Sequence, residues 1–266
     1  MTSRTLVMGI LNVTPDSFAD GGRHFSFADA LARAQTMIAE GVDIIDVGGE
    51  STRPGAERVS PDEEQNRVVP IITELVELGA TVSIDTMRAS TALAAISAGA
   101  QYVNDVSGGL ADVDMAPLIA KNPQIQYVAM HWRGHSADMQ SKAVYKNVVS
   151  EVKDELEDRT EALIKAGVQA EQIILDPGIG FAKTAEHNWE LLSNIDRLSL
   201  LGYPLLIGAS RKRFLGELLE GVDPDNRESA TIAITTEMAR LGVWGVRTHS
   251  VKPHRDAIEV VERLKR

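Results

Sequence analysis

Polar side chains stand where several short apolar runs of the chain end. Asp85, Asn104 and Asp176 close or nearly close three such runs, and Lys212 follows a fourth. Two carboxylates, one amide and one ammonium group together offer hydrogen-bond acceptors and donors. This set suits a flat heterocycle with an amidine-like edge, because a carboxylate such as Asp176 can accept two parallel N–H bonds from a 2-amino-4-oxo pyrimidine. The alternative for Asp85 and Asp176, taken singly, is that each only caps the helix that follows it.

A second group of side chains is basic, although the chain as a whole carries a formal charge of −11. It comprises Arg53, the run from Arg211 to Arg213, and Arg247 with His249. Guanidinium groups and helix N-termini that meet at one place suit a diphosphate. The alternative for Arg211 and Arg213 is that they are solvated surface charges.

Several other chemistries lack the residues that they need. The chain contains no cysteine, which excludes disulfides, thiolate metal sites and a cysteine nucleophile. It has no Gly-x-Ser-x-Gly motif, no Walker loop and no histidine pair spaced as in a zinc-binding helix with a glutamate between them. We therefore expect no transition metal held by protein ligands. Ser210 can act as a nucleophile only if the fold places a base beside it.

Composition restricts the partners and the location of the protein. An acidic chain with a pI near 5.1 is not suited to nucleic acids or to anionic membranes. The apolar run from Leu6 to Leu11 is too short to span a membrane, and Asn12 follows it instead of a small-residue cleavage site. We therefore expect a cytoplasmic protein that binds small molecules.

The apolar runs alternate with longer stretches of helical periodicity, which predicts an α/β protein with parallel strands. We expect strands at residues 6–11, 43–47, 81–85, 102–106, 126–131, 173–176, 205–209 and 245–247. We expect helices at residues 27–40, 61–79, 89–98, 115–120, 148–164, 189–195, 227–241 and 253–264, and another that begins at Arg211 or Lys212. Ser60, followed by proline and two acids, is a strong N-cap for the second of these helices.

Eight strands separated by helices fit either a closed barrel or an open doubly wound sheet. We favour one closed barrel formed by residues 1–266, because this length suits that fold and no linker divides the chain. A barrel also gathers the polar strand ends around one mouth, whereas an open sheet would spread them along a crevice.

Five motifs follow one another along the chain. They are MGILNVTPDSF at residues 8–18, DVGGESTRPG at 46–55, NDVSGG at 104–109, DPGIGF at 176–181 and SRK at 210–212. In sequence and spacing these motifs resemble the signatures of the dihydropteroate synthases, and the resemblance extends from Val7 to about Val260. It implies a single (β/α)8 TIM barrel and an enzyme of folate synthesis. Such an enzyme joins 6-hydroxymethyl-7,8-dihydropterin diphosphate to 4-aminobenzoate and releases diphosphate, with Mg²⁺ as cofactor and a homodimer as the expected assembly.

The resemblance also implies roles for the residues at matching positions. The pterin ligands that it implies are Asp85, Asn104, Met130, Asp176, Gly208 and Lys212. The diphosphate ligands are Asn12, which helps to hold Mg²⁺, together with Arg53, Arg247 and His249. The aminobenzoate contacts are Thr52, Pro54, Phe181, Lys212 and Arg213. The catalytic set is Asp85, Asp176, Lys212, Arg247 and His249, and the loops after the first two strands resemble mobile lids.

One position departs from the family pattern. Ser250 stands where the family more often has aspartate, whereas Arg247 and His249 match it. We expect this change to alter only the local support of the last strand end.

The chemistry of these substrates agrees with the residues present. An aromatic amine is neutral at neutral pH and carries its own lone pair, so the reaction needs no strong general base. The dihydropterin can share the positive charge that forms as diphosphate departs, which favours dissociative substitution with electrostatic stabilisation.

Three alternatives stay open at this point. One is a methyltransferase module that uses a folate methyl donor and a corrinoid partner. The others are a pterin-binding paralogue without turnover and a sugar-phosphate barrel enzyme. Retention of the motif residues 14–18 and 51–55 argues against the methyltransferase.

Overall fold

The computed structural model describes residues 4–13, 27–50, 59–135 and 139–265. Its strands are β1 (Leu6–Asn12), β2 (Ile44–Gly48), β3 (Val82–Asp85), β4 (Tyr102–Asp105), β5 (Gln126–Met130), β6 (Ile173–Asp176), β7 (Leu206–Ile207) and β8 (Gly245–Thr248). They form one parallel sheet in the order β6-β5-β4-β3-β2-β1-β8-β7. A parallel bridge between Leu175 and Leu205 joins the two ends of this order. The predicted barrel is therefore confirmed, and the open sheet is wrong.

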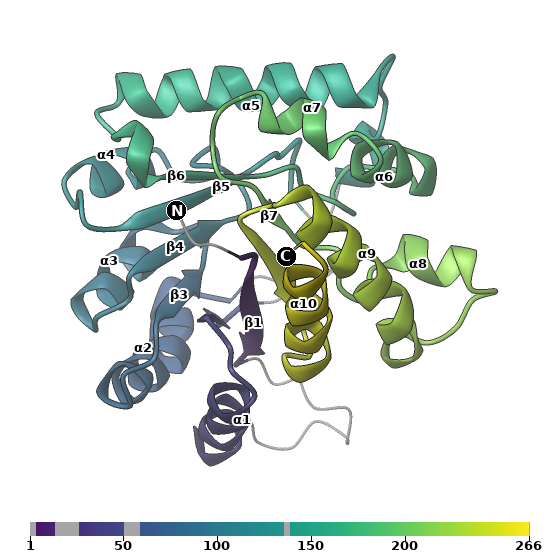
Figure 1. Cartoon of the computed structure of the whole chain (residues 1–266). Helices are drawn as coiled ribbons and strands as arrows, with labels where there is room; N and C mark the ends of the chain where they lie inside the picture. The colour runs from purple at the N-terminus through teal and green to yellow at the C-terminus, as the bar shows by residue number, and fades with distance from the viewer. Residues whose placement is uncertain (1–3, 14–26, 51–58, 136–138, 266) are drawn as a thin grey trace.

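Helices surround the strands on the outside (Figure 1). The helices are α1 (Phe27–Ala39), α2 (Pro61–Glu77), α3 (Ala89–Ser97), α4 (Met115–Ala120), α5 (Val148–Lys165), α6 (Ala185–Leu192), α7 (Ile195–Ser199), α8 (Arg213–Leu218), α9 (Glu228–Leu241) and α10 (Lys252–Leu264). Short 3-10 turns occupy η1 (Met139–Lys142), η2 (Ala170–Gln172) and η3 (Pro224–Arg227). No helix among the described residues combines the length and the hydropathy needed to cross a bilayer.

Local capping explains where the helices begin. Ser60 is the N-cap of α2, and its hydroxyl accepts a hydrogen bond from the Glu63 amide at 3.2 Å, as predicted. The single helix expected at residues 189–195 is wrong, because the structure has α6 and α7 there. Thr184 caps α6 by accepting from the His187 amide at 3.2 Å, so that helix begins four residues earlier than expected. The seventh strand is also shorter than the expected range 205–209.

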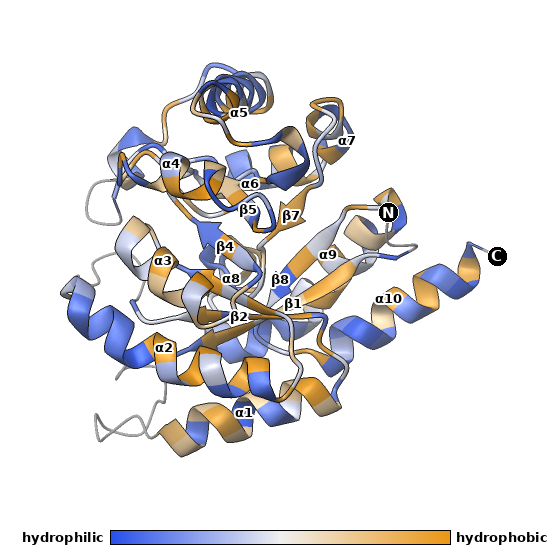
Figure 2. Cartoon of the chain, turned by 90° about the vertical axis from the view of Figure 1, so that its left-hand side faces the viewer, coloured by the Kyte–Doolittle hydropathy of each residue, from blue (hydrophilic) through white to orange (hydrophobic). Residues whose placement is uncertain are grey.

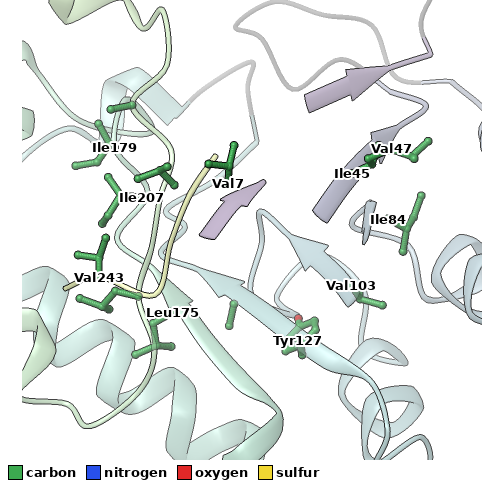
Figure 3. Close-up of a cluster of buried hydrophobic side chains, with 14 of the residues drawn as sticks. Val7, Ile45, Val47, Ile84, Val103, Tyr127, Leu175, Ile179, Ile207 and Val243 are labelled. Atoms are coloured by element: carbon green, nitrogen blue, oxygen red, sulfur yellow. The ribbon is translucent and has the colours of Figure 1, made fainter. Parts of the chain in front are cut away.

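Two apolar layers hold the barrel together. The larger one lies between the strands and the helices and includes Val7, Ile45, Ile84 and Val103 (Figure 3). The smaller one, which consists of strand residues, lies inside the barrel and contains Met8, Ile44, Val128, Ile174 and Leu206. Alternate residues of a strand point to opposite faces, which produces both layers from the same strands. Figure 2 accordingly shows much of the strand ribbon in orange and the outer helices in mixed orange and blue.

The inner face changes from apolar to polar toward the carboxyl ends of the strands. Strand register places Asn12 opposite Gly48, Gly48 opposite Asp85, and Asp85 opposite Asn104. On the other side of the barrel, Met130 lies opposite Asp176. The polar strand ends are thus brought together at one mouth of the barrel, where such barrels bind ligands.

Asp105 anchors the chain directly behind this mouth. Its carboxylate accepts hydrogen bonds from the Ser107 amide at 2.7 Å, the Ser107 hydroxyl at 2.6 Å, the Gly109 amide at 2.9 Å and the Tyr127 hydroxyl at 2.8 Å. Burial raises the pKa of Asp105, while the donors around it act in the opposite direction. The turn after β4 is therefore fixed next to Asn104, which points into the mouth.

Replacing Tyr127 by phenylalanine tests this anchor. Tyr127→Phe should lower the free energy of unfolding by about 1–3 kcal/mol, because a buried carboxylate loses one donor. The measurement is equilibrium unfolding in urea. Tyr203→Phe is the matched control, because the half-buried Tyr203 makes no hydrogen bond with any described residue; it should cost less than about 0.5 kcal/mol. Equal losses in the two variants would contradict the role of Asp105.

Candidate active site

Arg247 of β8 is the centre of a buried charge cluster at the barrel mouth. Its Nε donates to Oδ2 of Asp46 at 2.6 Å, and its Nη2 donates to Oδ2 of Asp85, also at 2.6 Å. Asn104 Nδ2 donates to the same Asp46 oxygen at 2.9 Å. One buried carboxylate therefore joins the arginine to the amide. Because its Nδ2 faces Asp46, Asn104 presents Oδ1 as its acceptor.

The charges of this cluster determine each other's protonation. Burial raises the pKa of Asp85 to about 7, with Arg247 opposing the shift and Asp46 adding to it. Burial also acts to lower the pKa of Arg247, but the carboxylates of Asp46 and Asp85 outweigh it, so the guanidinium stays charged. Arg247 occupies Oδ2 of Asp85, so a proton near neutral pH is carried on the other oxygen of that carboxyl group.

Asp176 presents one carboxylate oxygen to the mouth. Its Oδ1 accepts from the Gly178 amide at 2.7 Å, whereas Oδ2 makes no hydrogen bond with the described residues and lies beside Gly208. A Cβ at Gly208 would lie 3.7 Å from this oxygen and 3.9 Å from Cβ of Arg247. Glycine at this position therefore leaves the carboxylate uncovered. Burial raises the pKa of Asp176, while Lys212 lowers it.

Lys212 and Phe181 lie together on one side of the mouth. Lys212 Nζ donates to the Ile179 carbonyl and lies 4.4 Å from the centroid of the Phe181 ring. Burial lowers the pKa of Lys212 to about 8, against the influence of Asp176. Gly180, at φ 82°, allows this approach, because a Cβ there would be 2.7 Å from Lys212 Cδ. An ammonium group and an aromatic ring are thus presented together.

The remaining predicted anion ligands lie around this cluster. Asn12 Oδ1 would be 3.4 Å from a Cβ at Gly48, and Asp85 Oδ2 would be 3.7 Å from it, so both oxygens flank that glycine. His249 Nδ1 lies 2.9 Å from the Ser210 hydroxyl, which also accepts from the His249 amide at 3.2 Å. The His249 imidazole is therefore a base beside Ser210. The two contacts of the Ser210 hydroxyl fix the orientation of that imidazole.

Two of the predicted cations have partners of their own. Arg211 pairs with Asp225 at 2.5 Å and with Glu228 at 3.3 Å. Arg213 has a side chain that is 81% exposed and pairs with Glu217 at 3.1 Å. Thr52, Arg53 and Pro54 lie outside the described residues.

A partly open pocket among the described residues does not coincide with the mouth. It measures about 300 Å³ and lies between the end of β5 and α5, where Met130, His131, Trp132 and Arg159 border it. The convergence of strand ends defines the candidate active site better than this cavity does, because the charged groups meet there.

Sequence reasoning missed Asp46, and it missed the buried pair Lys183 and His131 with their partly exposed partner Glu155. Asp46 lies between the inward-facing positions 44 and 48 of β2 and is fully buried. A charge on the inner face of an apolar strand is a usable signal, because such a group needs a partner. Its partner Arg247 lies 201 residues away, so no local pattern identifies the pair.

Comparisons with known proteins point to one family. A family described as pterin binding enzymes matches residues 8–249. The dihydropteroate synthase of Mycobacterium leprae is 51% identical over 261 residues, covering 96% of this chain and 92% of the relative. That of Synechocystis is 44% identical, covering 98% and 90%.

Solved structures are similar over the whole fold. Xanthomonas albilineans dihydropteroate synthase with 4-aminobenzoic acid has a TM-score of 0.92 at 38% identity, covering 99% of this chain and 94% of the other. The complex of the Xanthomonas albilineans enzyme with 7,8-dihydropteroate has a TM-score of 0.89 at 35% identity, with the same coverage.

A charge-neutralising substitution tests the coupling within the cluster. Asp46→Asn should lower the pKa of Asp85 from about 7, because the negative charge that helps to raise it is removed. The measurement is the pH dependence of the Asp85 carboxyl carbon shift by nuclear magnetic resonance. Ser83→Ala is the matched control, because Ser83 is buried opposite Asp46 in the register and carries no charge. If the pKa of Asp85 in the Asp46→Asn variant stays at the wild-type value, the two carboxylates do not interact.

Proposed function

Because the chain belongs to the dihydropteroate synthases, a transferase family of pterin-binding enzymes, we infer that it joins 6-hydroxymethyl-7,8-dihydropterin diphosphate to 4-aminobenzoate. The products are 7,8-dihydropteroate and diphosphate. The observation that carries this inference is the meeting of Asp85, Asn104, Asp176 and Lys212 around Arg247 at one barrel mouth.

The pterin ring takes the polar inner face. Asp176 offers Oδ2 to the amino edge of the ring, and Asn104 offers Oδ1, because its Nδ2 is bound to Asp46. Lys212 meets the ring carbonyl, and Met130 and Gly208 pack against the ring. The uncovered Asp176 oxygen beside Gly208 supports this placement.

The diphosphate takes the cationic side of the mouth. Arg247 and His249 contact the leaving group, and Arg53 joins them on the ground of the family resemblance. Arg247 is held by two carboxylates, so its position is set before substrate binds. Departure of diphosphate then leaves a cation that the dihydropterin shares, as in a dissociative substitution.

Mg²⁺ is the cofactor that we propose, and the donor set agrees with it. Among the described residues, no three acidic or histidine side chains are grouped to enclose a metal. A cation that retains water and borrows phosphate oxygens needs few protein ligands, and Asn12 supplies a hard oxygen beside Gly48. When bound, Mg²⁺ neutralises charge on the diphosphate.

The aminobenzoate takes the side formed by Phe181 and Lys212, with Thr52 and Pro54 assigned by the resemblance. Its amine attacks without a strong base, because the lone pair is already available. Arg213 is exposed at the first position of α8, and we retain it as a partner for the carboxylate. Two further proposals are a homodimer, which rests on the resemblance alone, and a cytoplasmic location, which rests on the composition and the short apolar run from Leu6 to Leu11.

Product formation tests the proposed reaction. Incubation with pterin diphosphate, aminobenzoate and Mg²⁺ should yield dihydropteroate and diphosphate in equal amounts, measured by chromatography and a diphosphate assay. A chelator should abolish turnover, and added Mg²⁺ should restore it, because the leaving charge is otherwise unmet. Pterin binding without product would instead indicate a paralogue without turnover. Full activity in the chelator would contradict the metal proposal alone.

Asp176→Asn tests the pterin site separately. Asparagine retains an oxygen for the Gly178 amide but loses the charged acceptor, so affinity for a pterin without diphosphate should fall about 10- to 100-fold. The measurement is calorimetric titration. Asp225→Asn, whose side chain is 85% exposed in the wild type, should bind within about twofold of wild type. Unchanged affinity in Asp176→Asn would refute the pocket assignment.

A further inference from the structure

A polar chain that is buried at its inner end lies on the outer face of the barrel wall, beside the carboxyl ends of β5 and β6. Lys183 Nζ lies 3.0 Å from His131 Nδ1, and His131 Nε2 lies 3.0 Å from Oε2 of Glu155 on α5. Lys183 and His131 are each only 3% exposed. The proposed reaction uses none of these three groups, although burying a lysine is costly unless it has partners.

The donors and acceptors of this chain have one consistent arrangement. The ionised Glu155 carboxylate can only accept, so His131 Nε2 carries the hydrogen toward it and His131 Nδ1 accepts from Lys183. Burial lowers the pKa of His131 to about 4, and Lys183 adds to that shift, which agrees with a neutral ring. Arg133 Nε donates to Glu155 at 3.1 Å and fixes the outer end.

Lys183 also binds the turn that follows β6. Its Nζ donates to the Phe181 carbonyl at 3.1 Å. This turn has Gly178 at φ 68°, Gly180 at φ 82° and Ala182 at φ 46°, a conformation that is unfavourable for alanine. A Cβ at Gly178 would lie 2.6 Å from the His131 carbonyl, so the turn is pressed against the end of β5. The hydrogen bond from Lys183 therefore holds a turn whose backbone is strained at Ala182.

The same turn forms the aminobenzoate side of the mouth. It carries the Phe181 ring, and its Ile179 carbonyl accepts from Lys212. A change in the Phe181 carbonyl direction would move the ring that faces Lys212.

We propose that Lys183, oriented by His131 and Glu155, is a positioning residue that sets Phe181 for the aromatic amine substrate. The inference rests on the proposed function, because Phe181 is placed against aminobenzoate there. Lys183 touches neither substrate and acts through the Phe181 carbonyl. A merely structural role would lower stability and affect both substrates alike, whereas this role predicts a selective effect on aminobenzoate.

Lys183→Met removes both hydrogen bonds and retains an unbranched side chain. The KM for aminobenzoate should rise about tenfold, and pterin affinity should fall by a smaller factor, because the lost charge also helps to neutralise Asp176. Lys153→Met on α5 is the matched control, because the one ion pair that Lys153 makes with the described part of the chain is with Glu157 on the same helix, at 3.6 Å. Both kinetic constants of the control should stay within about twofold of wild type.

A pair of substitutions at His131 keeps the lysine charge in place. His131→Leu removes the acceptor of Lys183 and should raise the KM for aminobenzoate by about three- to tenfold. His131→Asn places an amide oxygen near the position of Nδ1, so it should restore the KM to within about twofold of wild type. Thermal unfolding of each variant identifies any general loss of structure, and the His131 pair decides the question if Lys183→Met does not fold.

The possible outcomes separate the two proposals. If the wild-type protein forms no dihydropteroate, the proposed function fails, and the inference fails with it. If the wild type is active and the His131 pair shows equal KM values for aminobenzoate, only the positioning role is overturned. A parallel rise in both substrate constants would likewise overturn it, because it would indicate a structural role.

Discussion

The structure depends on neutralising several carboxylates that the barrel buries at one mouth. Arg247 bonds to Asp46 and to Asp85, and its charge also stabilises the ionised form of Asp176. Removing such a cation would leave like charges in a low-dielectric interior, which typically costs several kcal/mol. Pairing of β8 with β1 places this arginine on the inner face within reach of Asp46 on β2 and Asp85 on β3. The fold and the site therefore depend on the same ion pairs, in which the buried carboxylates of Asp46 and Asp85 hold the guanidinium of Arg247.

Neighbouring residues at a strand end point to opposite faces of the barrel wall and therefore make different contacts. Asn104 points inward and binds Asp46, while Asp105 points outward and fixes the following turn. In the same way, Met130 lies opposite Asp176 on the inner register, while the next residue, His131, reaches Glu155 on α5. The ends of β4 and β5 therefore each place one side chain on the inner face of the barrel and the next one outside, where it holds a neighbouring segment. This explains why functional motifs extend beyond the residues that can touch a substrate.

The sequence predicts much of this because the relevant signals are local. Apolar runs that end in Asp85, Asn104 and Asp176 identify the strands and their polar ends, and register then brings them together. The pairing of Asp46 with Arg247 depends on the positions of β2 and β8 on either side of β1. These strands are far apart in the sequence, so no local pattern could reveal the pair. The support of Lys183 by His131 requires the packing of α5 on β5 and is equally non-local. The break between α6 and α7 was missed, although Thr184 offered a capping signal for the start of α6.

Two lysines hold the turn after β6, one from the mouth of the barrel and the other from outside the barrel wall. Lys212 donates to the Ile179 carbonyl from the mouth, and Lys183 donates to the Phe181 carbonyl from behind. Burial lowers the pKa of Lys183 to about 7 and that of Lys212 to about 8, while Asp176 opposes both shifts. A neutral amine still has two N–H groups, so loss of a proton near neutral pH leaves these hydrogen bonds available. As pH rises, the two lysines therefore lose the positive charge that neutralises Asp176. Their hydrogen bonds to the carbonyls of Ile179 and Phe181 are retained, so the geometry of the turn is less sensitive to pH than the lysine charge is.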